Sequence, residues 1–327
     1  MKVLYVGGTG EISQSCVLES LKLGHDVTVL NRSQTEQQLP AEVRQLTGDL
    51  GSGTPYASLG SEVFDSVCQF VAFDMQRVDE DVQMLSGRTG QYVFISTASA
   101  YHKPIDRFER ITERTPLQNP FWEYSRKKAR MEARLFEEHA RGTLPVTVVR
   151  PSHTYRRRLP SALGGGDWTA RRMLAGQPVI VHGDGTSLWT LTHATDFARP
   201  FARLLGNPRA LGEAFHITGE NVHTWDEILT EMGRALGVEP RLVHVASDTL
   251  VRYEPAWKGP LHGDKAPSTL FDNSKVSGVA GAFPTTIGLK EGFAAAAPEV
   301  RIRLERGLGK DPALDAKVDQ ILHEQGG

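Results

Sequence analysis

Tyr124 and Lys128 stand four residues apart in the segment Trp-Glu-Tyr-Ser-Arg-Lys-Lys. In a helix, residues at this spacing lie one turn apart on the same face. A lysine ammonium in that position lowers the pKa of a phenol from its ordinary value near ~10 toward neutrality. Such a phenol can take the proton of a hydroxyl group while a hydride leaves the adjoining carbon. The pair therefore predicts acid–base chemistry at a carbinol. Since the spacing also recurs by chance, the prediction depends on the rest of the chain.

A glycine turn stands at the start of the chain, where Lys2 to Val6 predicts a buried strand and Gly7-x-x-Gly10-x-x-Ser13 follows it. Gly7 allows a tight turn, and Gly10 lets the backbone approach a pyrophosphate held at the N-terminus of the next helix. Ser13 replaces the usual third glycine, which serves helix–strand packing and tolerates a small residue. The context predicts a dinucleotide site, and a plain glycine turn is the alternative.

The end of the second expected strand bears on the type of dinucleotide, and it reads Asn31-Arg32. An acidic residue there would favour NAD, whereas an arginine can face a 2′-phosphate. NADP is therefore favoured slightly over NAD, with a solvent-facing arginine as the alternative. In Gly48-Asp49-Leu50, Asp49 is placed to contact adenine, although a lone Gly-Asp is also typical of a turn.

The segment from Tyr92 to Tyr101 ends in small hydroxyl residues. Ligands of open parallel sheets bind at the carboxyl ends of the strands. Thr97 is therefore a candidate to hydrogen-bond the reacting hydroxyl or carbonyl group. Ser96 and Ser99 fit packing or capping roles equally well.

The elements that must position these residues follow from apolar runs separated by helical segments. The runs are Lys2–Val6, Asp26–Leu30, Ser66–Ala72, Gln91–Ile95 and Pro145–Val149. Such alternation is typical of a parallel sheet that is covered by helices on both faces. We therefore predict an α/β fold, a Rossmann doubly wound parallel sheet, with a smaller C-terminal α+β substrate lobe.

The regular alternation of apolar runs and helical segments ends near Arg156, where the sequence becomes loop-like. This change sets the expected division of the chain into domains. We predict an NAD(P)-binding Rossmann domain over residues 1–158, completed by 192–218, and a substrate-binding lobe over 159–191 and 219–327. Val179–Thr192 predicts a hairpin about Gly183-Asp184-Gly185. Helices are expected over Asp167–Leu174, Asp196–Leu205 and Trp225–Leu236, and over most of Pro298–His323.

Composition limits the classes of partner. The chain has 327 residues, 39% hydrophobic and 23% charged, with a formal net charge of −2. That balance is typical of a globular enzyme and argues against broad nucleic-acid binding. Cys16 and Cys68 have no pairing or metal-ligand spacing, and we expect no metal. With a strand at the N-terminus and no long apolar run, we expect a soluble, cytoplasmic protein with a small-molecule substrate and no membrane or nucleic-acid partner.

These features together resemble the extended short-chain dehydrogenase/reductase superfamily, of the NAD-dependent epimerase/dehydratase type, over nearly the whole chain. The motifs are Gly-Gly-Thr-Gly, Ser-Thr-Ala-Ser-Ala-Tyr, Tyr-Ser-Arg-Lys-Lys, Val-Val-Arg-Pro-Ser-His-Thr-Tyr, Gly-Asp-Gly-Thr, Thr-His-Ala-Thr-Asp, Phe-His-Ile-Thr-Gly and Asp-Asn-Ser-Lys. The resemblance implies that Thr97 orients the substrate, Tyr124 is the acid/base and Lys128 binds the nicotinamide ribose. Many relatives dimerise through the tyrosine-bearing helix, so a homodimer is expected by analogy.

The cofactor-binding residues follow from the resemblance and the strand ends. The full set is Gly7, Thr9, Gly10, Glu11, Ile12, Asn31, Arg32, Asp49, Leu50, Phe70, Val71, Ala72, Lys128, Pro151, Ser152 and His153. Substrate contacts are assigned to Ser99, Tyr101 and Tyr155, in an aromatic-rich site with Phe73, Trp122 and Trp189. Simple packing is the alternative for these aromatic residues.

Departures from the family pattern narrow the chemistry. Thr97 is followed by Ala98 and Ser99. The Asp-Glu pair of dehydrating relatives and the glutamate of decarboxylating relatives are therefore missing. His102 and His153 replace a usual glycine and asparagine, which argues against an ordinary UDP-hexose substrate. The expected function is an NAD(P)-dependent oxidoreductase or epimerase acting on a hydroxyl-bearing carbon of a sugar, sugar nucleotide or similar polyol.

Several alternatives stay open at this point. His153 suits a nicotinamide or substrate contact, or a satisfied core histidine. The run 156–158 of three arginines suits a diphosphate clamp or a solvated loop, while His193 and Asp196 fit structural roles. A different class is an NADP-binding sensor or RNA-binding relative, as in a chloroplast branch that the N-terminus and Pro-Ser-His resemble. Such relatives commonly lose the tyrosine or lysine, and this chain keeps both.

Overall fold

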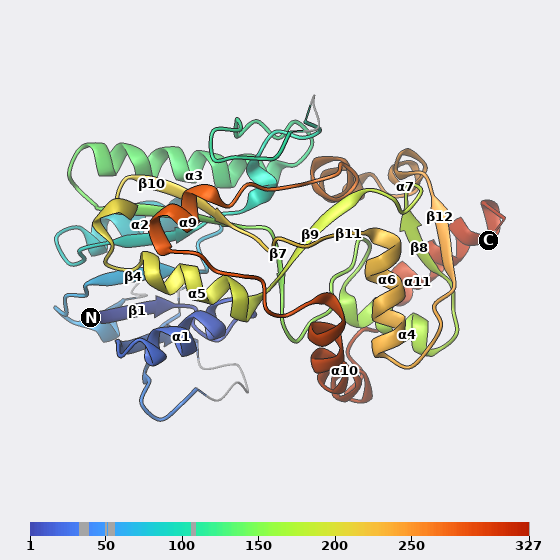
Figure 1. Cartoon of the computed structure of the whole chain (residues 1–327), viewed down its shortest axis with the longest axis horizontal. Helices are drawn as coiled ribbons and strands as arrows, with labels where there is room; N and C mark the ends of the chain where they lie inside the picture. Colours follow the sequence, from blue (N-terminus) through green and yellow to red (C-terminus); the bar gives the residue numbers. More distant parts are fainter. Residues whose placement is uncertain (33–38, 50, 52–55, 106–108, 327) are drawn as a thin grey trace.

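A seven-stranded parallel sheet forms the first domain (Figure 1). The computed structural model describes residues 1–327 except 33–38, 50, 52–55, 106–108 and 327. The strands are β1 (Lys2–Val6), β2 (Asp26–Asn31), β3 (Arg44–Thr47), β4 (Ser66–Gln69), β5 (Tyr92–Ile95), β6 (Val146–Pro151) and β10 (Glu213–Ile217), in the order β10-β6-β5-β4-β1-β2-β3. Strand order reverses between β1 and β4, where doubly wound sheets bind ligands. The α/β prediction is confirmed.

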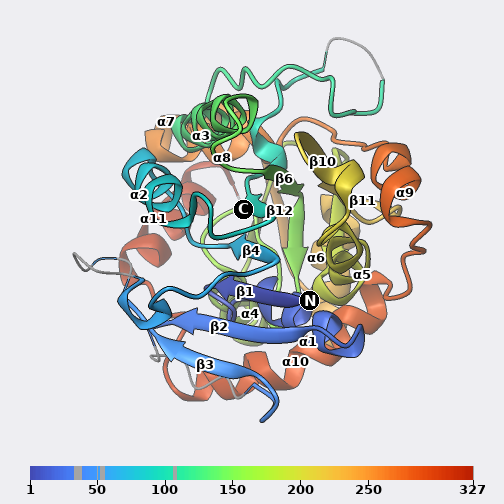
Figure 2. The same ribbon diagram turned by 90° about the vertical axis from the view of Figure 1, so that its left-hand side faces the viewer.

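Helices cover both faces of this sheet (Figures 1 and 2). On one face lie α1 (Ser13–Lys22), α5 (Ala194–Leu204) and α9 (Ser274–Ala280), and on the other α2 (Met75–Leu85) and α3 (Glu123–Ala140). Each face has its own apolar core: Val17, Phe197 and Val276 belong to the first, and Val78 and Leu135 to the second. Strands buried on both sides explain why the runs read as nearly continuous apolar segments.

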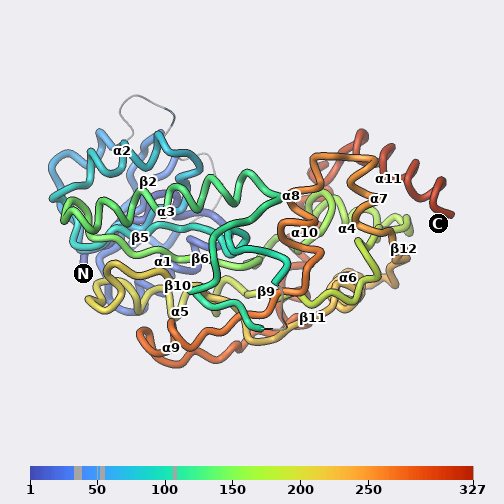
Figure 3. Tube along the Cα trace, turned by 90° about the horizontal axis from the view of Figure 1, so that it is seen from above, coloured from blue at the N-terminus to red at the C-terminus, as the bar shows by residue number. Residues whose placement is uncertain are grey.

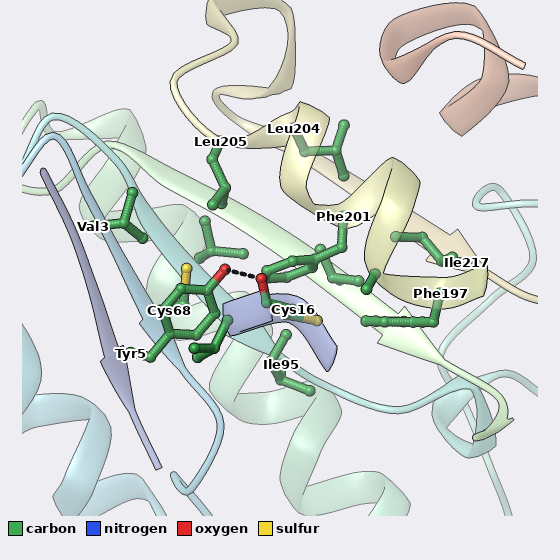
Figure 4. Packing of buried hydrophobic residues seen from close by; sticks show 14 of the residues in the cluster. Val3, Tyr5, Cys16, Cys68, Ile95, Phe197, Phe201, Leu204, Leu205 and Ile217 are labelled. Carbon is green, nitrogen blue, oxygen red and sulfur yellow. Dashed lines mark hydrogen bonds between the residues drawn. The ribbon is translucent and has the colours of Figure 1, made fainter. Parts of the chain in front are cut away.

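The first core also holds both cysteines (Figure 4). The Tyr5 hydroxyl bonds the Ser20 hydroxyl at 2.7 Å and donates to the carbonyl of Cys16 at 3.1 Å. Both thiols are fully buried, and burial raises their pKa. A thiol that is buried and protonated packs as a small apolar group, so neither cysteine is placed for nucleophilic chemistry.

The second lobe lies beyond the carboxyl ends of the strands (Figure 1). It contains a three-stranded sheet of β7 (His153–Tyr155), β9 (Leu188–His193) and β11 (Val222–Thr224), and a parallel pair of β8 (Val179–His182) and β12 (Leu242–Val245). Its helices are α4 (Gly166–Leu174), α6 (Trp225–Ala235), α7 (Ser247–Tyr253), α8 (Lys258–Pro260), α10 (Leu289–Glu305) and α11 (Pro312–Glu324), with a π-helical turn at Leu261–Lys265. Short 3₁₀ turns are Ala57–Leu59, Ala98–Ala100, Pro208–Ala210 and Pro255–Trp257.

The hairpin predicted for Val179–Thr192 is wrong. The chain does turn there, since Gly183 and Gly185 have φ of 68° and 75°. However, β8 pairs with β12, whereas β9 pairs with β7 and β11. Two apolar runs about a glycine turn have the same pattern whether they pair with each other or enter different sheets.

The chain crosses between the lobes more often than its sequence suggests. Residues 192–218 supply α5 and β10 to the first domain. The segment 219–327, assigned to the second lobe, also returns to the first domain as α9, where Lys275 donates to Glu213 at 2.7 Å and to the carbonyl of Ala214 at 2.8 Å. In the opposite direction, β7 leaves the first 158 residues and joins the sheet of β9 and β11. Domain membership here depends on packing partners that are distant in sequence.

His193 and Asp196 have the structural roles expected for them. His193 caps α5 by accepting the amide of Thr195 at 3.3 Å. The Asp196 carboxylate accepts the amides of Thr286 at 3.0 Å and Ile287 at 2.9 Å. These contacts fix the start of α5 to the segment that leads into α10.

Candidate active site

A cavity of about 390 Å³ lies at the carboxyl ends of β1, β4, β5 and β6. It brings Thr97, Tyr124 and Lys128 together with the glycine turn. Its wall consists of Gly7, Gly10, Glu11, Ile12, Ser13, Phe70, Val71, Phe73, Ile95, Ser96, Thr97, Tyr124, Lys128, Pro151, Ser152, His153 and Thr154. The cavity therefore occupies the point of the sheet where the strand order reverses.

The glycine turn is held in a shape that suits a diphosphate. Gly7 has φ +83°, and a Cβ on Gly8 would lie 2.7 Å from the side chain of Val29, so both positions require glycine. The Ser13 hydroxyl donates to the carbonyl of Gly7 at 2.6 Å and accepts the amide of Gly10 at 2.9 Å. Ser13 therefore stabilises the turn through two hydrogen bonds, in addition to fitting the space of the usual third glycine. The first turn of α1 has no side-chain cap, and its N-terminus opens on the cavity, where amide groups favour an anion.

Lys128 reaches the cavity floor from α3. Only 2% of its surface is exposed, and its ammonium donates to the carbonyls of Ala72 at 2.8 Å and Ile95 at 2.9 Å. The ammonium also lies 4.7 Å from the ring centre of Phe94. Burial lowers the pKa of Lys128 to about 8. Because an ammonium has three N–H groups, one remains for a group in the cavity.

Tyr124 stands on the same face of α3. Burial, and then the nearby Asp264 carboxylate, raises the pKa of Tyr124 above its ordinary value. The sequence predicted that Lys128 lowers the pKa of Tyr124. That prediction is wrong, because the protein's own groups raise this pKa. Spacing along a helix fixed the two positions, but the lysine ammonium bonds backbone carbonyls and a low-dielectric wall surrounds the phenol.

Thr97 caps the 3₁₀ turn Ala98–Ala100 and begins a row of hydroxyl groups. Its hydroxyl bonds that of Ser99 at 3.0 Å, which bonds the hydroxyl of Ser125 at 2.8 Å. Thr97 lies on the cavity wall, whereas Ser99 is 4% exposed and lies behind it. Ser99, predicted to contact substrate, is therefore joined to the cavity wall through its hydrogen bond to Thr97.

A buried ionic group supports the catalytic helix from behind. Glu132, one turn beyond Lys128, accepts the Arg150 guanidinium at 2.6 Å and a hydrogen bond from the Ser96 hydroxyl. Arg150 also donates to the Tyr101 hydroxyl at 3.1 Å. Tyr101 is fully buried, so this side chain, predicted to bind substrate, packs behind the site.

The other aromatic residues predicted to line the substrate site fall into two groups, one on the cavity wall and one packed away from it. Phe73 lies on the cavity wall. Tyr155 is 3% exposed and packs edge-on against Phe293, and Trp189 is 2% exposed and packs 5.5 Å from Trp225. Trp122 packs 5.2 Å from the ring of Tyr124. Packing therefore accounts for Tyr155 and Trp189, the alternative stated from sequence.

Comparison with known proteins agrees with this geometry. A model of the NAD dependent epimerase/dehydratase family matches residues 3–218. The chain belongs to this family.

Relatives of this family member have diverse functions. The chain is 28% identical over 243 residues to the 2′-dehydrokanamycin reductase of Streptomyces kanamyceticus, and the match covers 72% of this chain and 67% of that protein. It is 29% identical over 258 residues to the chloroplast stem-loop binding protein of 41 kDa b of Arabidopsis thaliana, covering 74% of this chain. The match spans 65% of the length of that plant protein.

Solved structures of the family share the fold. The UDP-glucuronic acid 4-epimerase of Bacillus cereus, in complex with UDP-glucuronic acid and NAD, aligns with a TM-score of 0.73 at 18% identity over 92% of this chain and 99% of that one. The UDP-glucose 4-epimerase of Thermus thermophilus, in complex with NAD, gives a TM-score of 0.71 at 20% identity over 92% of this chain and 99% of that one. Family membership implies NAD(P) binding.

The predicted adenosine contacts lie away from the cavity wall. Asn31 ends β2, where its carbonyl accepts the amide of Gly48 at 3.0 Å, and Arg32 is exposed. Asp49 accepts the amide of Gly51 at 2.9 Å in a turn. Leu50 lies outside the described residues. Thr9 and Ala72 adjoin wall residues, and Ala72 supplies the carbonyl that holds Lys128.

His153 and the three arginines after it occupy the junction of the lobes. His153 lies on the cavity wall, and burial lowers its pKa to about 4, so it is neutral. Arg156 donates to Gln14, and Arg157 pairs with Glu11 at 3.3 Å. In this arrangement the arginines attach the second lobe to the start of α1, a role that differs from both alternatives stated from sequence.

Sequence reasoning missed several residues of the site. Ile95, Ser96 and Thr154 are wall residues next to predicted ones, so the strand ends already pointed to them. Lys103 and Asp264 are different: they form an ion pair of 2.5 Å beside Tyr124 although they stand far apart in sequence. No spacing or periodicity marked them.

Among the described residues, no group of three or more His, Cys, Asp or Glu side chains is placed to hold a metal ion. Within the same part of the chain, no helix has the length and apolar character of a membrane span.

Proposed function

We propose that this protein is an NAD(P)-dependent oxidoreductase or epimerase that acts on a hydroxyl-bearing carbon of a sugar, sugar nucleotide or similar polyol. The observation that carries the proposal is that Thr97, Tyr124 and Lys128 share one cavity wall with the glycine turn. A carbinol held there meets a hydroxyl group, a phenol and an ammonium within the same enclosure.

The wall residues fit a nicotinamide dinucleotide. The open N-terminus of α1 and the braced turn Gly7–Gly10 suit its diphosphate. Lys128 suits a ribose hydroxyl, and Pro151 to His153 suit the nicotinamide end. Arg32 is exposed at the end of β2 and supports a preference for NADP over NAD.

The chain's own groups divide the proton chemistry. When bound, an oxidised nicotinamide dinucleotide supplies a hydride acceptor and a positive charge, and a positive charge lowers the pKa of a phenol. Tyr124 takes the proton of the substrate hydroxyl, and Thr97 holds the same oxygen in line. Lys128 holds its position through the two carbonyls that it bonds. In an epimerase the ketone turns over and is reduced on its other face. In a dehydrogenase the ketone leaves as the product, whereas in a reductase a ketone enters and Tyr124 gives its proton to the ketone oxygen, which becomes the hydroxyl of the product.

Two further observations support this class of reaction. The residues after Thr97 are Ala98 and Ser99, which lack the carboxylates that elimination or decarboxylation needs. The relatives named above include a reductase and two sugar-nucleotide epimerases by name.

Replacing the phenol oxygen tests the proposal. Tyr124→Phe should lower turnover at least about 10²-fold, because the proton acceptor is lost, while dinucleotide affinity changes less than about twofold. Turnover is followed as absorbance of the reduced dinucleotide and as chromatography of the sugar product, over a panel of sugars and sugar nucleotides. Tyr253→Phe, on α7 in the second lobe, is the matched control. Full turnover by Tyr124→Phe would remove Tyr124 from the mechanism.

A second candidate function is binding of RNA without turnover. It is favoured by the 29% identity to the chloroplast stem-loop binding protein. Gel-shift titration with a stem-loop RNA tests it directly. Tight RNA binding with no turnover over the whole panel would support this candidate, and turnover that depends on Tyr124 would contradict it.

A further inference from the structure

Three charged side chains gather near Tyr124. Lys103 is 1% exposed and pairs with Asp264 at 2.5 Å, and Lys265 is the next residue after Asp264. Two ammonium groups and one carboxylate give the cluster a net positive charge when all three are ionised. Lys265 ends the π-helical turn Leu261–Lys265, and such turns occur often at functional sites.

Lys265 has no carboxylate partner among the described residues. The carboxylate of Asp264 already bonds Lys103, and the Lys265 ammonium instead lies 5.8 Å from the ring centre of Trp122. Burial lowers the pKa of Lys265, the Asp264 carboxylate acts in the opposite direction, and the Lys103 charge lowers the pKa further. Since a buried charge is costly without a partner, this ammonium is a place where an external anion would be stabilised.

The cluster lies near Tyr124 and His153, two residues of the cavity wall. Trp122, which carries the Lys265 ammonium over its ring, packs 5.2 Å from the ring of Tyr124. The charge of Lys265 lowers the pKa of His153, which lies on the cavity wall, and the charge of Asp264 raises the pKa of Tyr124. A group bound to Lys265 would therefore lie near the part of the cavity wall that carries Tyr124 and His153.

The surrounding segments hold the cluster firmly. Asn119 donates to the carbonyls of Gly263 at 2.6 Å and Ser99 at 2.7 Å, which fixes the π-helical turn to the strand end that carries Thr97. A Cβ on Gly259 would lie 2.4 Å from the ring of Trp122. Figure 3 shows α8 beside this end of α3, at the junction of the lobes. The position of Lys265 is thus determined by packing.

A buried donor without an acceptor adjoins the same cluster. The indole N–H of Trp189 is buried and has no hydrogen-bond partner within the described chain, and the Lys103 ammonium lies 5.4 Å from its ring centre. An unpaired buried donor costs about 1–3 kcal/mol. A polar atom from outside the protein would remove that cost.

We propose that Lys265 binds an anionic group of the substrate, a carboxylate or a phosphate, so that the enzyme acts on acidic polyols in preference to neutral or cationic ones. This inference rests on the proposed function for the identity of the reacting carbon. The positive cluster would repel the ammonium of an aminosugar. A neutral sugar would leave the ammonium of Lys265 without a charged partner.

Ligand binding tests the proposal independently of turnover. In the full chain saturated with NADP⁺, affinities of glucuronate, glucose 6-phosphate, glucose and glucosamine are measured by calorimetry and by tryptophan fluorescence. At least one of the two anions should bind about tenfold or more tightly than glucose, and glucosamine should bind no better than glucose. The anion that binds distinguishes a carboxylate from a phosphate site.

Substitution of the lysine locates the effect. Lys265→Met should reduce the affinity of the preferred anion about tenfold and change glucose affinity less than about twofold, whereas Lys265→Arg should retain most of the anion affinity. Lys258→Met, an exposed lysine on the same segment, is the matched control. Circular dichroism verifies that each variant folds, and the comparison of ligands on the unmodified protein does not depend on any variant.

Each outcome decides one of the two proposals. Equal binding of all four ligands, or an anion preference that survives Lys265→Met, would overturn the anion site while turnover dependent on Tyr124 still stood. Absence of turnover over the whole sugar panel would overturn the proposed function, and a Lys265-dependent anion preference would then remain as a binding property alone.

Discussion

Among the individual residues, Lys128 places an ammonium group in the site although burial disfavours its charged form. Its ammonium lies among apolar rings and is stabilised by two main-chain carbonyls. The balance lowers its pKa to about 8, so that burial outweighs the Glu132 carboxylate, which acts in the opposite direction. Two of its three N–H groups bond these carbonyls, so one remains for a group bound in the cavity.

This burial predicts a pH dependence of stability. Between about pH 8 and about pH 10 the unfolded chain binds more protons at Lys128 than the folded protein does, so the free energy of unfolding gains a contribution that rises with pH. Below about pH 8 both states are protonated and the full cost of burying the charge is present. We therefore compare the free energy of unfolding of the unmodified protein with that of Lys128→Met, measured in urea at two pH values. The unmodified protein should gain about 1–3 kcal/mol relative to the variant between pH 7.5 and pH 10.

Lys127→Met is the control for this comparison, since Lys127 is the exposed neighbour on the same helix. Its difference from the unmodified protein should not change with pH. If the two lysine variants behaved alike across this range, the altered pKa of Lys128 would be refuted.

Among the secondary-structure elements, three segments that carry the site are connected by Asn119. Its amide group donates to carbonyls of the 3₁₀ turn after Thr97 and of the π-helical turn, and its oxygen accepts the amides of Phe121 at 3.0 Å and Trp122 at 3.1 Å. These last two amides precede α3, so one side chain fixes the start of the helix that bears Tyr124. The element boundaries and the catalytic geometry therefore depend on the same four hydrogen bonds.

Asn119→Ala removes all four bonds and leaves buried groups without partners. We expect a loss of about 2–4 kcal/mol in the free energy of unfolding, and lower turnover because Tyr124 is held less well. Gln118→Ala, at the exposed preceding residue, is the control and should change stability by less than about 0.5 kcal/mol. Thermal or urea unfolding measures the first effect, and the sugar assay measures the second. A stability loss no larger than that of the control would show that these bonds contribute little.

Across the molecule as a whole, a series of ion pairs connects the dinucleotide turn to the second lobe. Glu11 on the cavity wall pairs with Arg157, whose carbonyl accepts Arg303 at 2.8 Å, and Arg303 pairs with Asp167 at the start of α4. Glu11 places a carboxylate where phosphates are expected to bind. Arg157 neutralises that charge, so the second lobe contributes to the electrostatics of a site built on the first.

Removing Arg157 should therefore weaken dinucleotide binding. Arg157→Met leaves the Glu11 carboxylate unneutralised, and we expect about tenfold lower affinity for NADP by calorimetry. Adding Glu11→Gln in the double variant should restore affinity to within about threefold. Arg158→Met, at the exposed next residue, should have little effect. Equal losses in the single and double variants would mean that Arg157 acts by some means other than neutralising Glu11.

The class of fold and the centre of the site were predictable from the order of residues along the chain. Apolar runs alternating with helical segments predicted the parallel sheet because strands buried on both faces need continuous apolar residues. The glycine turn, Thr97, Tyr124 and Lys128 were recognisable because their positions are set by local rules, namely a strand end and a helical repeat.

Packing between distant segments settled which lobe each later segment joins and what surrounds the catalytic groups. Pairing of β8 with β12, the return of α9 and the burial of Tyr101 and Tyr155 depend on partners far away in sequence. The pKa of Tyr124 rises because of burial and of Asp264, which stands 140 residues later in the chain. Lys103, Asp264 and Lys265 meet only when the second lobe packs on the first, because charge and dielectric are properties of the assembled volume.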